Sequence, residues 1–567
     1  MRGPRFRRTR PSVRALRSTS GRNVMHHVKL SDPADRTVDR ILRAQAEMVG
    51  DDEFLVEENT RHTYAAVDDL ADRHASGYAE LGIGAGDTVA LLMHNSVDMA
   101  VTSFGVNRLG AVWSAISPEY RGEWLGELLN SVGSPVLVLD DELWSSVAAL
   151  PVIPFRHLVI RGSSQQARSE APAGVAVHDF DDLARGHAIR HDSKAYYGDT
   201  NAILWTSGTT GRSKGVMQSH NVWITYAQRH NEIYRDGVRE GERFYGCIPM
   251  YNSGGWIMNV YPALLTGVPA CIDKRFSVSD YWNRLRYFDA HHTILLGTMP
   301  LYLAQQPACD DDTENPLRTA CINPLPRNLP EFMARFGLER VGSGFGQSEI
   351  MGATLYSSDW PLKPGSSGFV RDDDPVETRL LDADDNEVGE NEVGEICVRP
   401  RAPFAIFNGY FNEPEKTIEA FRNLWYHTGD LARRDADGEL FFADRKKDSL
   451  RHKGRNINSF EVEHIARQFP GVTDVAAVGV TLTEMDHEEE LRICLLLGDG
   501  ATVDRLEFCK FMDAKAPYYF VPRYVDVLDA FPLTPTGKVQ KFKIRERGID
   551  AATWDRLEHA ADWSPTR

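Results

Sequence analysis

The sequence predicts an α/β protein with a large first domain and a smaller α+β domain at the end of the chain. In the first half of the chain, short apolar segments alternate with amphipathic helical segments, which is typical of a parallel sheet with helices on both faces. Residues 361–414 are rich in Gly, Asp and Glu between short alternating runs, which indicates antiparallel strands. A compact module follows from about residue 448, and its roughly 120 residues are normal for one domain.

The large domain begins with helical patterns around a short extended piece at 52–56. Residues 70–81 are amphipathic and lead into Gly82 and Gly84, so a helix is expected to end there. The expected elements that follow are a strand over 88–93, a helix over 97–109, a strand over 111–116, a helix over 122–132 and a strand over 135–139. Residues 162–193 are rich in Gly, Ser, Ala and charge, and a variable surface connection is expected there.

Short alternating runs at 378–381 and 395–398 predict two of the antiparallel strands. The elements expected in the small module are a helix over 459–469, strands over 472–480 and 491–497, and a helix over 506–516. We therefore expect a basic tail over 1–24, a large domain over 25–447 and a small, final domain over 448–567.

The first residues differ from the rest of the chain. Eight arginines precede the first acidic residue, Asp32, and no apolar segment of a secretory signal accompanies them. This composition favours a disordered tail, or a true start at Met25, over a transit peptide or a tether to an anionic surface.

Composition argues against several classes of protein. A formal net charge of −17 and a pI near 5.6 argue against a nucleic-acid-binding protein. No stretch approaches the roughly 18 apolar residues of a membrane span, so no integral membrane segment is expected. The seven cysteines form no C-x-x-C pair, so neither a disulfide framework nor a zinc site is indicated, and a reducing cytoplasm fits best. The sequence leaves open whether the protein forms a homodimer.

The most informative stretch is a Gly- and hydroxyl-rich loop over 206–215. A short apolar strand, 202–205, precedes it, and residues 216–223 begin a helical pattern. Glycines let backbone N–H groups approach an anion, hydroxyls add donors and Lys214 adds a mobile charge, so the loop suits phosphate. The alternative is a polar surface turn. The common nucleotide-kinase loop is excluded, because it places its lysine directly after a glycine, whereas Lys214 follows Ser213.

This loop resembles the phosphate-binding signature of the adenylate-forming superfamily, which includes acyl-CoA synthetases, luciferases and the adenylation domains of peptide synthetases. Five further stretches resemble motifs of that family and occur in the same order. Residues 246–256 resemble its acyl-pocket strand, residues 344–349 its aromatic–Gly–x–Ser/Thr–Glu motif and residues 425–430 its ribose-binding Thr-Gly-Asp motif. Residues 444–448 with 453–454 resemble its interdomain hinge, and residues 535–538 resemble its catalytic-lysine loop. The resemblance extends over about 37–547. It implies layered, mostly parallel sheets with helices, a β-barrel-like subdomain and a small mobile C-terminal domain.

The resemblance also implies a site for ATP, Mg²⁺ and CoA. Lys538, Thr206 and Glu349 would be catalytic: Lys538 would neutralise charge on the transferring phosphoryl group, and Glu349 would hold the metal. The implied nucleotide-binding residues are Thr206, Ser207, Gly208, Thr209, Thr210, Gly211 and Lys214 for the phosphates, Phe345, Gly346, Gln347 and Ser348 around the adenine, and Asp430 and Arg445 for the ribose.

The implied acyl pocket consists of Asn252, Gly254, Trp256, Gly344 and Met351. The hinge position is Lys447, and the implied CoA side consists of Arg451, Lys453 and Gly454. Many relatives carry His at the Asn252 position; an amide can hydrogen-bond a carboxylate but carries no charge. Peptide-synthetase domains place an acid there for the α-ammonium group, so an α-amino acid substrate is disfavoured. The composition of the pocket favours a medium-to-long aliphatic, alicyclic or steroid-derived acid, and residues 449–463 resemble the crotonobetaine/carnitine-CoA ligase-like subgroup.

The resemblance therefore predicts an ATP-dependent acid–CoA ligase that forms an acyl-adenylate, releases pyrophosphate and then makes the thioester. Three alternatives stay open at this point. One is an adenylation enzyme that loads a separate carrier protein, and another is a nucleotide-binding sensor without turnover. Luciferase-like oxygenation would use the same motifs.

Overall fold

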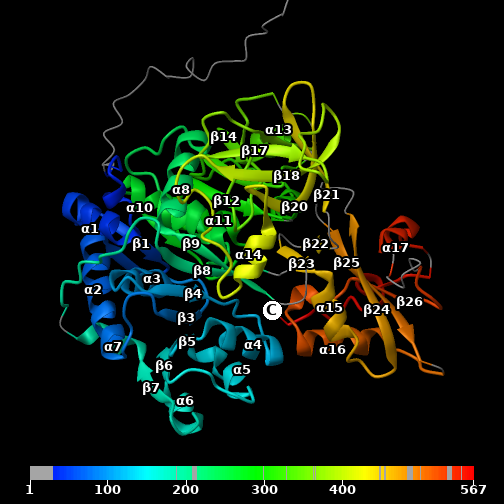
Figure 1. Cartoon of the computed structure of the whole chain (residues 1–567), viewed down its shortest axis with the longest axis horizontal. Coiled ribbons are helices and arrows are strands. Elements are labelled where there is room, and N and C mark those ends of the chain that lie inside the picture. The colour runs from blue at the N-terminus through cyan, green and yellow to red at the C-terminus, as the bar shows by residue number, and fades with distance from the viewer. Residues whose placement is uncertain are drawn as a thin grey trace, which may run out of the picture.

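A computed structural model describes residues 28, 30–186, 188–206, 213–297, 299–326, 328–361, 363, 365–445, 449–452, 455–481, 489–498, 500–532, 539, 541–550 and 552–566. The predicted basic tail over 1–24 and the proposed boundary between 447 and 448 lie outside these residues. Figure 1 shows the large N-terminal part beside a smaller C-terminal part that is coloured orange to red.

The first parallel sheet carries the segment that leads into the phosphate-loop candidate. In spatial order, its described strands are β7 (Ala176–Asp179), β6 (His157–Arg161), β5 (Val136–Asp140), β3 (Thr88–Leu92), β4 (Val112–Ala115), β8 (Thr200–Thr206) and β9 (Lys214–Ser219). All neighbouring strands are parallel except β8 and β9, which are antiparallel.

The second sheet is parallel in its centre and antiparallel at both edges. In spatial order, its described strands are β15 (Tyr356–Ser357), β14 (Arg340–Ser343), β13 (Thr319–Asn323), β12 (His292–Leu296), β10 (Phe244–Gly246), β11 (Ala270–Ile272), β1 (Glu53–Glu57) and β2 (Thr60–Thr63). Only the β14–β15 and β1–β2 pairs of this sheet are antiparallel among the described residues.

The two sheets share a layer of helices and each has further helices on its outer face. Along β3, Val89 and Leu91 join the central core, whereas Ala90 and Leu92 join a core on the other face, because neighbouring side chains of a strand point in opposite directions. The central layer contains α1 (Val38–Val49), α2 (Tyr64–Glu80), α3 (Val97–Arg108), α8 (His220–Tyr234), a π-helix, η4 (Trp256–Val260), and α10 (Tyr261–Thr266). The outer helices are α4 (Gly122–Val132), α5 (Trp144–Ala148) and α6 (Gln165–Glu170) on the first sheet, and α11 (Tyr281–Phe288), α12 (Met299–Gln305) and α13 (Leu329–Phe336) on the second.

Local capping sets where several of these helices begin. The hydroxyls of Thr63, Ser96 and Ser219 accept backbone N–H groups at the first turns of α2, α3 and α8. Helix α4 ends at Gly133 in the left-handed conformation, with φ of 62°. Shorter helical elements are η2 (Pro33–Asp35), η3 (Asp141–Leu143), α7 (Phe180–Arg185) and α9 (Ser253–Gly255).

An antiparallel sheet packs beside these layers and has its own core (Figure 1). In spatial order, its described strands are β16 (Ser366–Phe369), β21 (Glu439–Arg445), β20 (Trp425–Arg434), β18 (Val393–Pro400) and β17 (Val376–Leu381), and β19 (Phe421–Arg422) also pairs with β20. Helix α14 (Pro414–Ala420) precedes β19. The antiparallel unit predicted over 361–414 is therefore present and continues to Arg445.

The C-terminal part contains a hairpin, β22 (Ser449–His452) with β23 (Arg455–Asn458), and a further mixed sheet. This sheet has the order β24 (Val472–Thr481), β25 (Glu489–Leu497), β26 (Tyr524–Val527) and β27 (Trp554–Asp555). The helical elements are α15 (Ser459–Ala466), α16 (Arg505–Lys515), η5 (Tyr518–Phe520), α17 (Lys541–Arg547) and α18 (Arg556–His559). Trp124 of α4 packs against this core, with its ring 6.3 Å from that of His464 on α15.

The structure corrects one sequence expectation about local structure and adds regular elements to another segment. Residues 216–219, the start of the segment 216–223 that was expected to begin a helix, belong to strand β9 instead. The reason is that β8 pairs with one edge of β9 and residues 408–411 donate and accept backbone hydrogen bonds at the other. The helix begins only at His220. Residues 162–193, expected to form a variable surface connection, contain α6, β7 and α7, because β7 pairs with β6 and Phe180 and Leu183 reach the central core.

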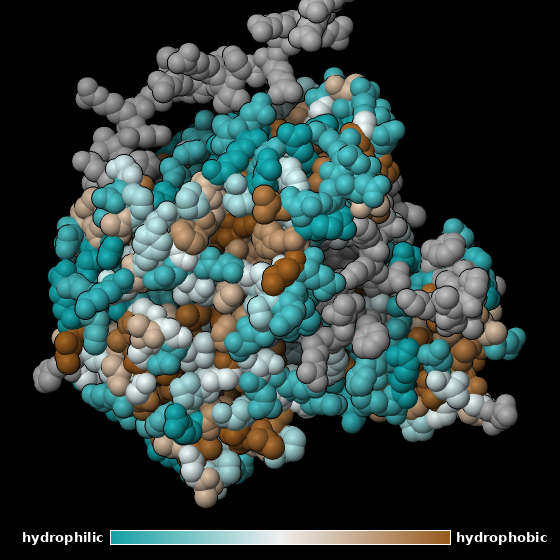
Figure 2. Space-filling model, in the orientation of Figure 1, coloured by the Kyte–Doolittle hydropathy of each residue, from teal (hydrophilic) through white to brown (hydrophobic). Residues whose placement is uncertain are grey.

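Figure 2 shows a mainly hydrophilic face with small, separate hydrophobic groups. In the part of the chain that the structure describes, no helix combines the length and apolar character needed to cross a membrane.

Candidate functional site

The ends of the phosphate-loop candidate are fixed by the β8–β9 pair. Thr206 at the end of β8 lies opposite Lys214 at the start of β9, so the two ends of the predicted loop lie side by side. A Cβ atom at Gly215 would lie 2.9 Å from the Ile203 side chain, which explains why this position needs glycine. Five predicted phosphate ligands lie outside the described residues: Ser207, Gly208, Thr209, Thr210 and Gly211.

Glu349 is the buried acid of the candidate site, with 8% of its surface exposed. The Tyr410 hydroxyl donates a hydrogen bond of 3.0 Å to Glu349 Oε1, and the Phe407 amide donates one of 2.8 Å to the Glu349 carbonyl. Burial raises the pKa of Glu349; the Tyr410 hydroxyl and the charge of Lys214 lower it, and the charge of Asp430 adds to the rise. Two charges far away in sequence therefore act on this one carboxyl group.

Lys214 reaches the same region from β9. Its Nζ lies 4.5 Å from the centre of the Tyr410 ring, close enough for a cation–π interaction. Tyr410 thus contacts both the basic residue of the loop and the buried acid.

Gln347 joins two of the predicted motifs. Its side-chain Nε2 donates hydrogen bonds to the Asp430 carboxylate and to the Thr428 carbonyl, the latter at 3.0 Å. Its Oε1 accepts a hydrogen bond of 3.1 Å from the Tyr426 hydroxyl. Asp430 is buried in β20 and lies opposite Arg445 of β21, whose side chain is outside the described atoms. The amide therefore holds the buried Asp430 carboxylate in one orientation.

The segment around Phe345 is a tight turn. A Cβ atom at Gly344 would lie 2.3 Å from the Thr354 carbonyl oxygen, and one at Gly346 would lie 2.2 Å from the Met351 carbonyl oxygen. Met351 itself has a φ of 51°, which is unusual for a side chain of this size. The half-buried Phe345 ring lies 6.4 Å from the Phe442 ring. Close backbone packing explains both glycines.

Two of the predicted acyl-pocket residues, Gly254 and Gly344, lie at the carboxyl edge of the second parallel sheet. Strands β13 and β14 end beside each other, and Asn323 Oδ1 accepts hydrogen bonds from the Gly344 amide, at 3.0 Å, and the Ser343 hydroxyl, at 2.6 Å. A Cβ atom at Gly254 would lie 3.3 Å from the Ile248 side chain and 3.6 Å from Leu296. Ligands of open α/β sheets bind at this edge.

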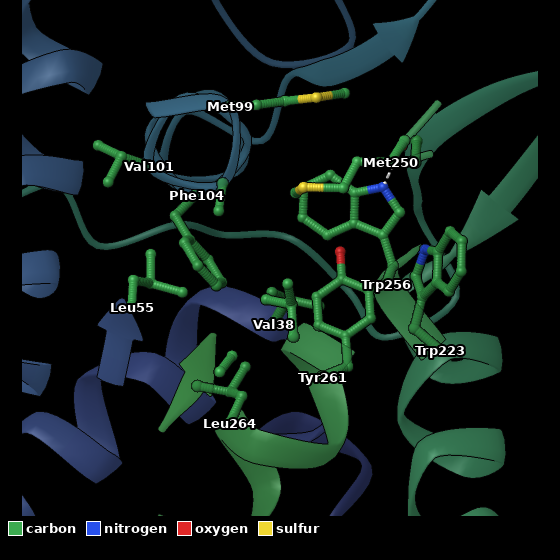
Figure 3. Close-up of a cluster of buried hydrophobic side chains, with 14 of the residues drawn as sticks. Val38, Leu55, Met99, Val101, Phe104, Trp223, Met250, Trp256, Tyr261 and Leu264 are labelled. Atoms are coloured by element: carbon green, nitrogen blue, oxygen red, sulfur yellow. Dashed lines mark hydrogen bonds between the residues drawn. The ribbon is translucent and has the colours of Figure 1, made fainter. Parts of the chain in front are cut away.

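Trp256, another predicted pocket residue, lies within the central core (Figure 3). It is fully buried, its indole N–H donates a hydrogen bond of 2.5 Å to the Met250 carbonyl, and its ring lies 4.5 Å from that of Trp113. Asn252, by contrast, is partly exposed just before α9. These positions make Trp256 part of the support for the pocket segment, and contact with an acyl group stays a prediction for both residues.

Most of the remaining predicted site residues lie outside the residues that the structure describes. These are the hinge Lys447, the catalytic Lys538, and Lys453 and Gly454 of the CoA side; of Arg451, only the backbone in β22 is described. Ser348 is described, and its carbonyl accepts a hydrogen bond of 2.5 Å from the Gln218 side chain.

Sequence reasoning missed Tyr410, Gln218 and Asn323, and it included Tyr426 in the 425–430 motif without giving it a role. Tyr410 and Gln218 meet the site only through chain segments that are remote in sequence, so no local pattern marked them. Asn323 had a usable signal, because a polar amide ends the apolar run of β13, and such positions of a parallel sheet commonly face ligands.

Comparisons with known proteins agree with this architecture. Crotonobetaine/carnitine–CoA ligase of Salmonella heidelberg (strain SL476) is 26% identical over 496 residues, which cover 85% of this chain and 93% of that protein. A solved structure of o-succinylbenzoate CoA synthetase from Bacillus subtilis has a TM-score of 0.75 at 22% identity and covers 90% of this chain and 98% of its own.

The amide bond synthetase of Marinactinospora thermotolerans has a TM-score of 0.74 at 22% identity, covering 91% of this chain and 100% of its own. At such identities, these solved structures establish the fold alone. The profile of the family described as AMP-binding enzyme matches residues 42–411, well over half of the sequence. The chain therefore belongs to the AMP-binding enzyme family.

Proposed function

We propose that this enzyme activates a carboxylic acid with ATP, releases pyrophosphate and transfers the acyl group from the adenylate to CoA. One observation carries the proposal: residues of three separate motifs lie around the buried Glu349 carboxyl group. Tyr410 contacts both Glu349 and Lys214, and the charges of Lys214 and Asp430 both act on Glu349. A phosphate-binding cation, a metal-binding acid and a ribose-binding acid are the groups that one ATP molecule needs.

In the proposed complex, the β8–β9 hairpin holds the β- and γ-phosphates, with Thr206 and Lys214 at its two ends. Asp430 accepts hydrogen bonds from the ribose hydroxyls. Gln347 supports this role, because its hydrogen bonds to Asp430 and to the Thr428 carbonyl orient the acceptor before the nucleotide arrives. Phe345 provides an aromatic face for the adenine.

The residues present fit a magnesium ion. Burial raises the pKa of the Glu349 carboxyl group, so an ionised Glu349 requires a nearby positive charge. A hard divalent cation shared with phosphate oxygens would supply this charge. When bound, Mg²⁺ would add positive charge to the phosphate-binding site. The chain holds the carboxylate in place through the Tyr410 hydroxyl.

In the first half-reaction, a carboxylate oxygen forms a bond to the α-phosphorus of ATP while the bond to pyrophosphate breaks. Negative charge increases on the oxygens around that phosphorus. Lys538 is the proposed counter-charge, and such pre-placed cations are among the largest contributions to phosphoryl-transfer catalysis.

In the second half-reaction, the CoA sulfur attacks the adenylate carbonyl, AMP leaves and the thiol proton passes to solvent. We propose that the small domain rotates about Lys447, which withdraws Lys538 and brings the 451–454 face to the site. A groove of about 280 Å³, lined by residues that include Tyr120, Trp124 and Ser213, lies beside the phosphate loop. Trp124 also contacts His464 of α15, so this groove lies where the large N-terminal part meets the C-terminal part. This position supports the proposal that CoA enters there.

The acyl group proposed for this pocket is a medium-to-long aliphatic, alicyclic or steroid-derived one. Gly254 faces the apolar side chains of Ile248, Leu296 and Ile294, and Asn252 offers an uncharged amide. The name of the crotonobetaine/carnitine–CoA ligase relative agrees with CoA as the acceptor. We place the enzyme in the cytoplasm, since six of its seven free cysteines are buried thiols of the kind that a reducing compartment maintains.

A pyrophosphate-release assay over a panel of carboxylic acids, with and without CoA, tests this function. We expect acid-dependent release of pyrophosphate and a CoA thioester as product. Asp430→Asn should raise the KM for ATP, whereas Asp181→Asn, at an exposed position of α7, should leave it unchanged. No release with any acid would favour a nucleotide sensor. Thioester formation only with a carrier protein would favour the carrier-loading alternative.

A further inference from the structure

A second group of metal-binding side chains lies in the antiparallel sheet, outside the proposed ATP site. On β18, Glu395 and Cys397 are two residues apart and project from the same face. On β20, His427 is the direct cross-strand partner of Cys397. Strand pairing therefore brings together a carboxylate, a thiol and an imidazole from positions about thirty residues apart along the chain.

The donor atoms of these residues are close together. His427 Nδ1 lies 3.3 Å from Cys397 Sγ and 2.9 Å from Glu395 Oε2. One donor atom from each residue lies within 4.8 Å of the other two. An ion with bonds of roughly 2.0–2.3 Å to nitrogen, oxygen and sulfur would place its ligands about 3–4 Å apart, so small shifts are enough to accommodate it.

The group is buried, which distinguishes it from acidic clusters on protein surfaces. Cys397 is fully buried, and the side chains of Glu395 and His427 are 5% and 11% exposed. Cys397 packs with Leu381 and Trp425, which keep water from one side of the thiol. Ligands in such a setting bind a soft ion more strongly than they would in water.

A second carboxylate lies beyond the other ring nitrogen of His427. Asp385 Oδ1 lies 3.6 Å from His427 Nε2, on the side of the ring away from the cysteine, and Arg422 and Asn423 hold that carboxylate. Without a cation, Glu395 lies at hydrogen-bond distance from Nδ1 and favours the tautomer with the proton on that nitrogen. A cation bound to Nδ1 requires the proton to move to Nε2, on the side of the ring that faces Asp385. This arrangement of carboxylate, histidine and metal is common in zinc proteins.

We propose that Glu395, Cys397 and His427 form a binding site for a thiophilic divalent cation of the Zn²⁺ and Co²⁺ class. Binding forms a metal–sulfur bond and releases the Cys397 proton to solvent. Glu395 Oε1 also accepts a hydrogen bond of 2.9 Å from the amide of Gly429, the residue before Asp430. The cation therefore sits directly behind the turn that carries the proposed ribose acceptor.

Cobalt absorption tests the site in the full-length protein. After chelator treatment and dialysis, titration with Co²⁺ should give a thiolate-to-cobalt charge-transfer band that saturates at one ion per chain, and Zn²⁺ should abolish the band. Cys397→Ser should weaken Co²⁺ binding by roughly a hundredfold or more and remove the band. Cys494→Ser, which changes another buried free thiol on a central strand, should leave both unchanged.

Titration of the wild-type protein tests the site even if a variant fails to fold. Absence of a charge-transfer band in the wild-type titration, or a band that persists in Cys397→Ser, would overturn the proposal. Glu395→Gln provides a second variant that keeps the shape of the side chain and its acceptor for Gly429; it should weaken Co²⁺ binding while circular dichroism stays unchanged. Unaltered Co²⁺ affinity in that variant would remove Glu395 from the site.

Discussion

Glu461 in the C-terminal part predicts an unusual dependence of stability on pH. It is 0% exposed at the start of α15, and neither carboxyl oxygen has a hydrogen-bond partner among the described residues. Burial raises its pKa to about 8, whereas a glutamate in an unfolded chain has a pKa of about 4.3. The folded protein therefore keeps a proton that the unfolded chain gives up between about pH 4.5 and pH 8.

The sign and size of the effect follow from this difference. Because the folded state binds the extra proton, stability is lost as the pH rises through that window. One pKa unit corresponds to about 1.4 kcal/mol, so the loss reaches about 3 kcal/mol at pH 7. Glu461→Gln removes the ionisation and keeps the shape, so the variant should be more stable than the wild type at pH 7 by about this amount and nearly equal to it at pH 4.5.

Glu463 provides a matched control two residues away on the same helix. Its Oε1 accepts a hydrogen bond of 2.8 Å from the Ala477 amide and lies 2.6 Å from Lys541 Nζ. Glu463→Gln weakens these charge-assisted contacts and should destabilise the folded state by about 1–3 kcal/mol at pH 7. The two substitutions therefore have opposite signs.

Hydrogen exchange of the full-length protein measures the effect where it arises. Peptides that cover α15 and β24 should gain protection in Glu461→Gln and lose it in Glu463→Gln at pH 7. A Glu461→Gln protein that is less protected than the wild type, or whose advantage is the same at pH 5 and pH 7.5, would refute the reasoning. Either result would mean that the carboxyl group has a stabilising partner.

Three further substitutions test the candidate site. Tyr410→Phe removes the hydroxyl that donates to Glu349 and should lower kcat/KM for adenylate formation by roughly tenfold to a hundredfold, as measured by pyrophosphate exchange; unchanged exchange would count against this contact. Gly346→Ala places a Cβ 2.2 Å from a carbonyl oxygen and should raise the KM for ATP strongly. Gly186→Ala is the control and should not raise it, because a Cβ there meets no atom within 4 Å. Equal effects of the two substitutions would contradict the importance of close backbone packing at Gly346. Lys447→Pro restricts φ at the proposed hinge and should slow thioester formation more than adenylate formation in single-turnover assays, and equal slowing would argue against the hinge.

Local sequence patterns correctly predicted the helices and strands whose ends depend on residues nearby in the sequence. The helix over 122–132 has the predicted bounds, and the strand over 88–93 is one residue shorter than predicted, because apolar spacing and the Gly133 cap determine both locally. Strand β9 could not be predicted in the same way. Its second edge is covered by residues 408–411, almost two hundred residues later in the chain.

The candidate site likewise combines features that were predictable from the sequence with contacts that were not. The motifs that contain Lys214, Glu349 and Asp430 were visible in the sequence, and the structure brings them together. The contacts that orient them were not visible. Tyr410 was not predicted, and Gln347 was predicted as a nucleotide-binding residue without its hydrogen bond to Asp430, because both contacts join distant segments. The sequence indicated no zinc site, because Cys397 and His427 meet only through the pairing of β18 with β20.

Separate assays of the two half-reactions in the Lys538→Ala variant test the proposed ATP site most directly. If Lys538 and the loop near residue 210 act on the same bound ATP, the variant should lose adenylate formation from acid and ATP, measured as pyrophosphate release. It should still convert a supplied acyl-adenylate and CoA to the thioester at close to the wild-type rate. Normal pyrophosphate release by the variant, or loss of both half-reactions in a folded protein, would contradict the account.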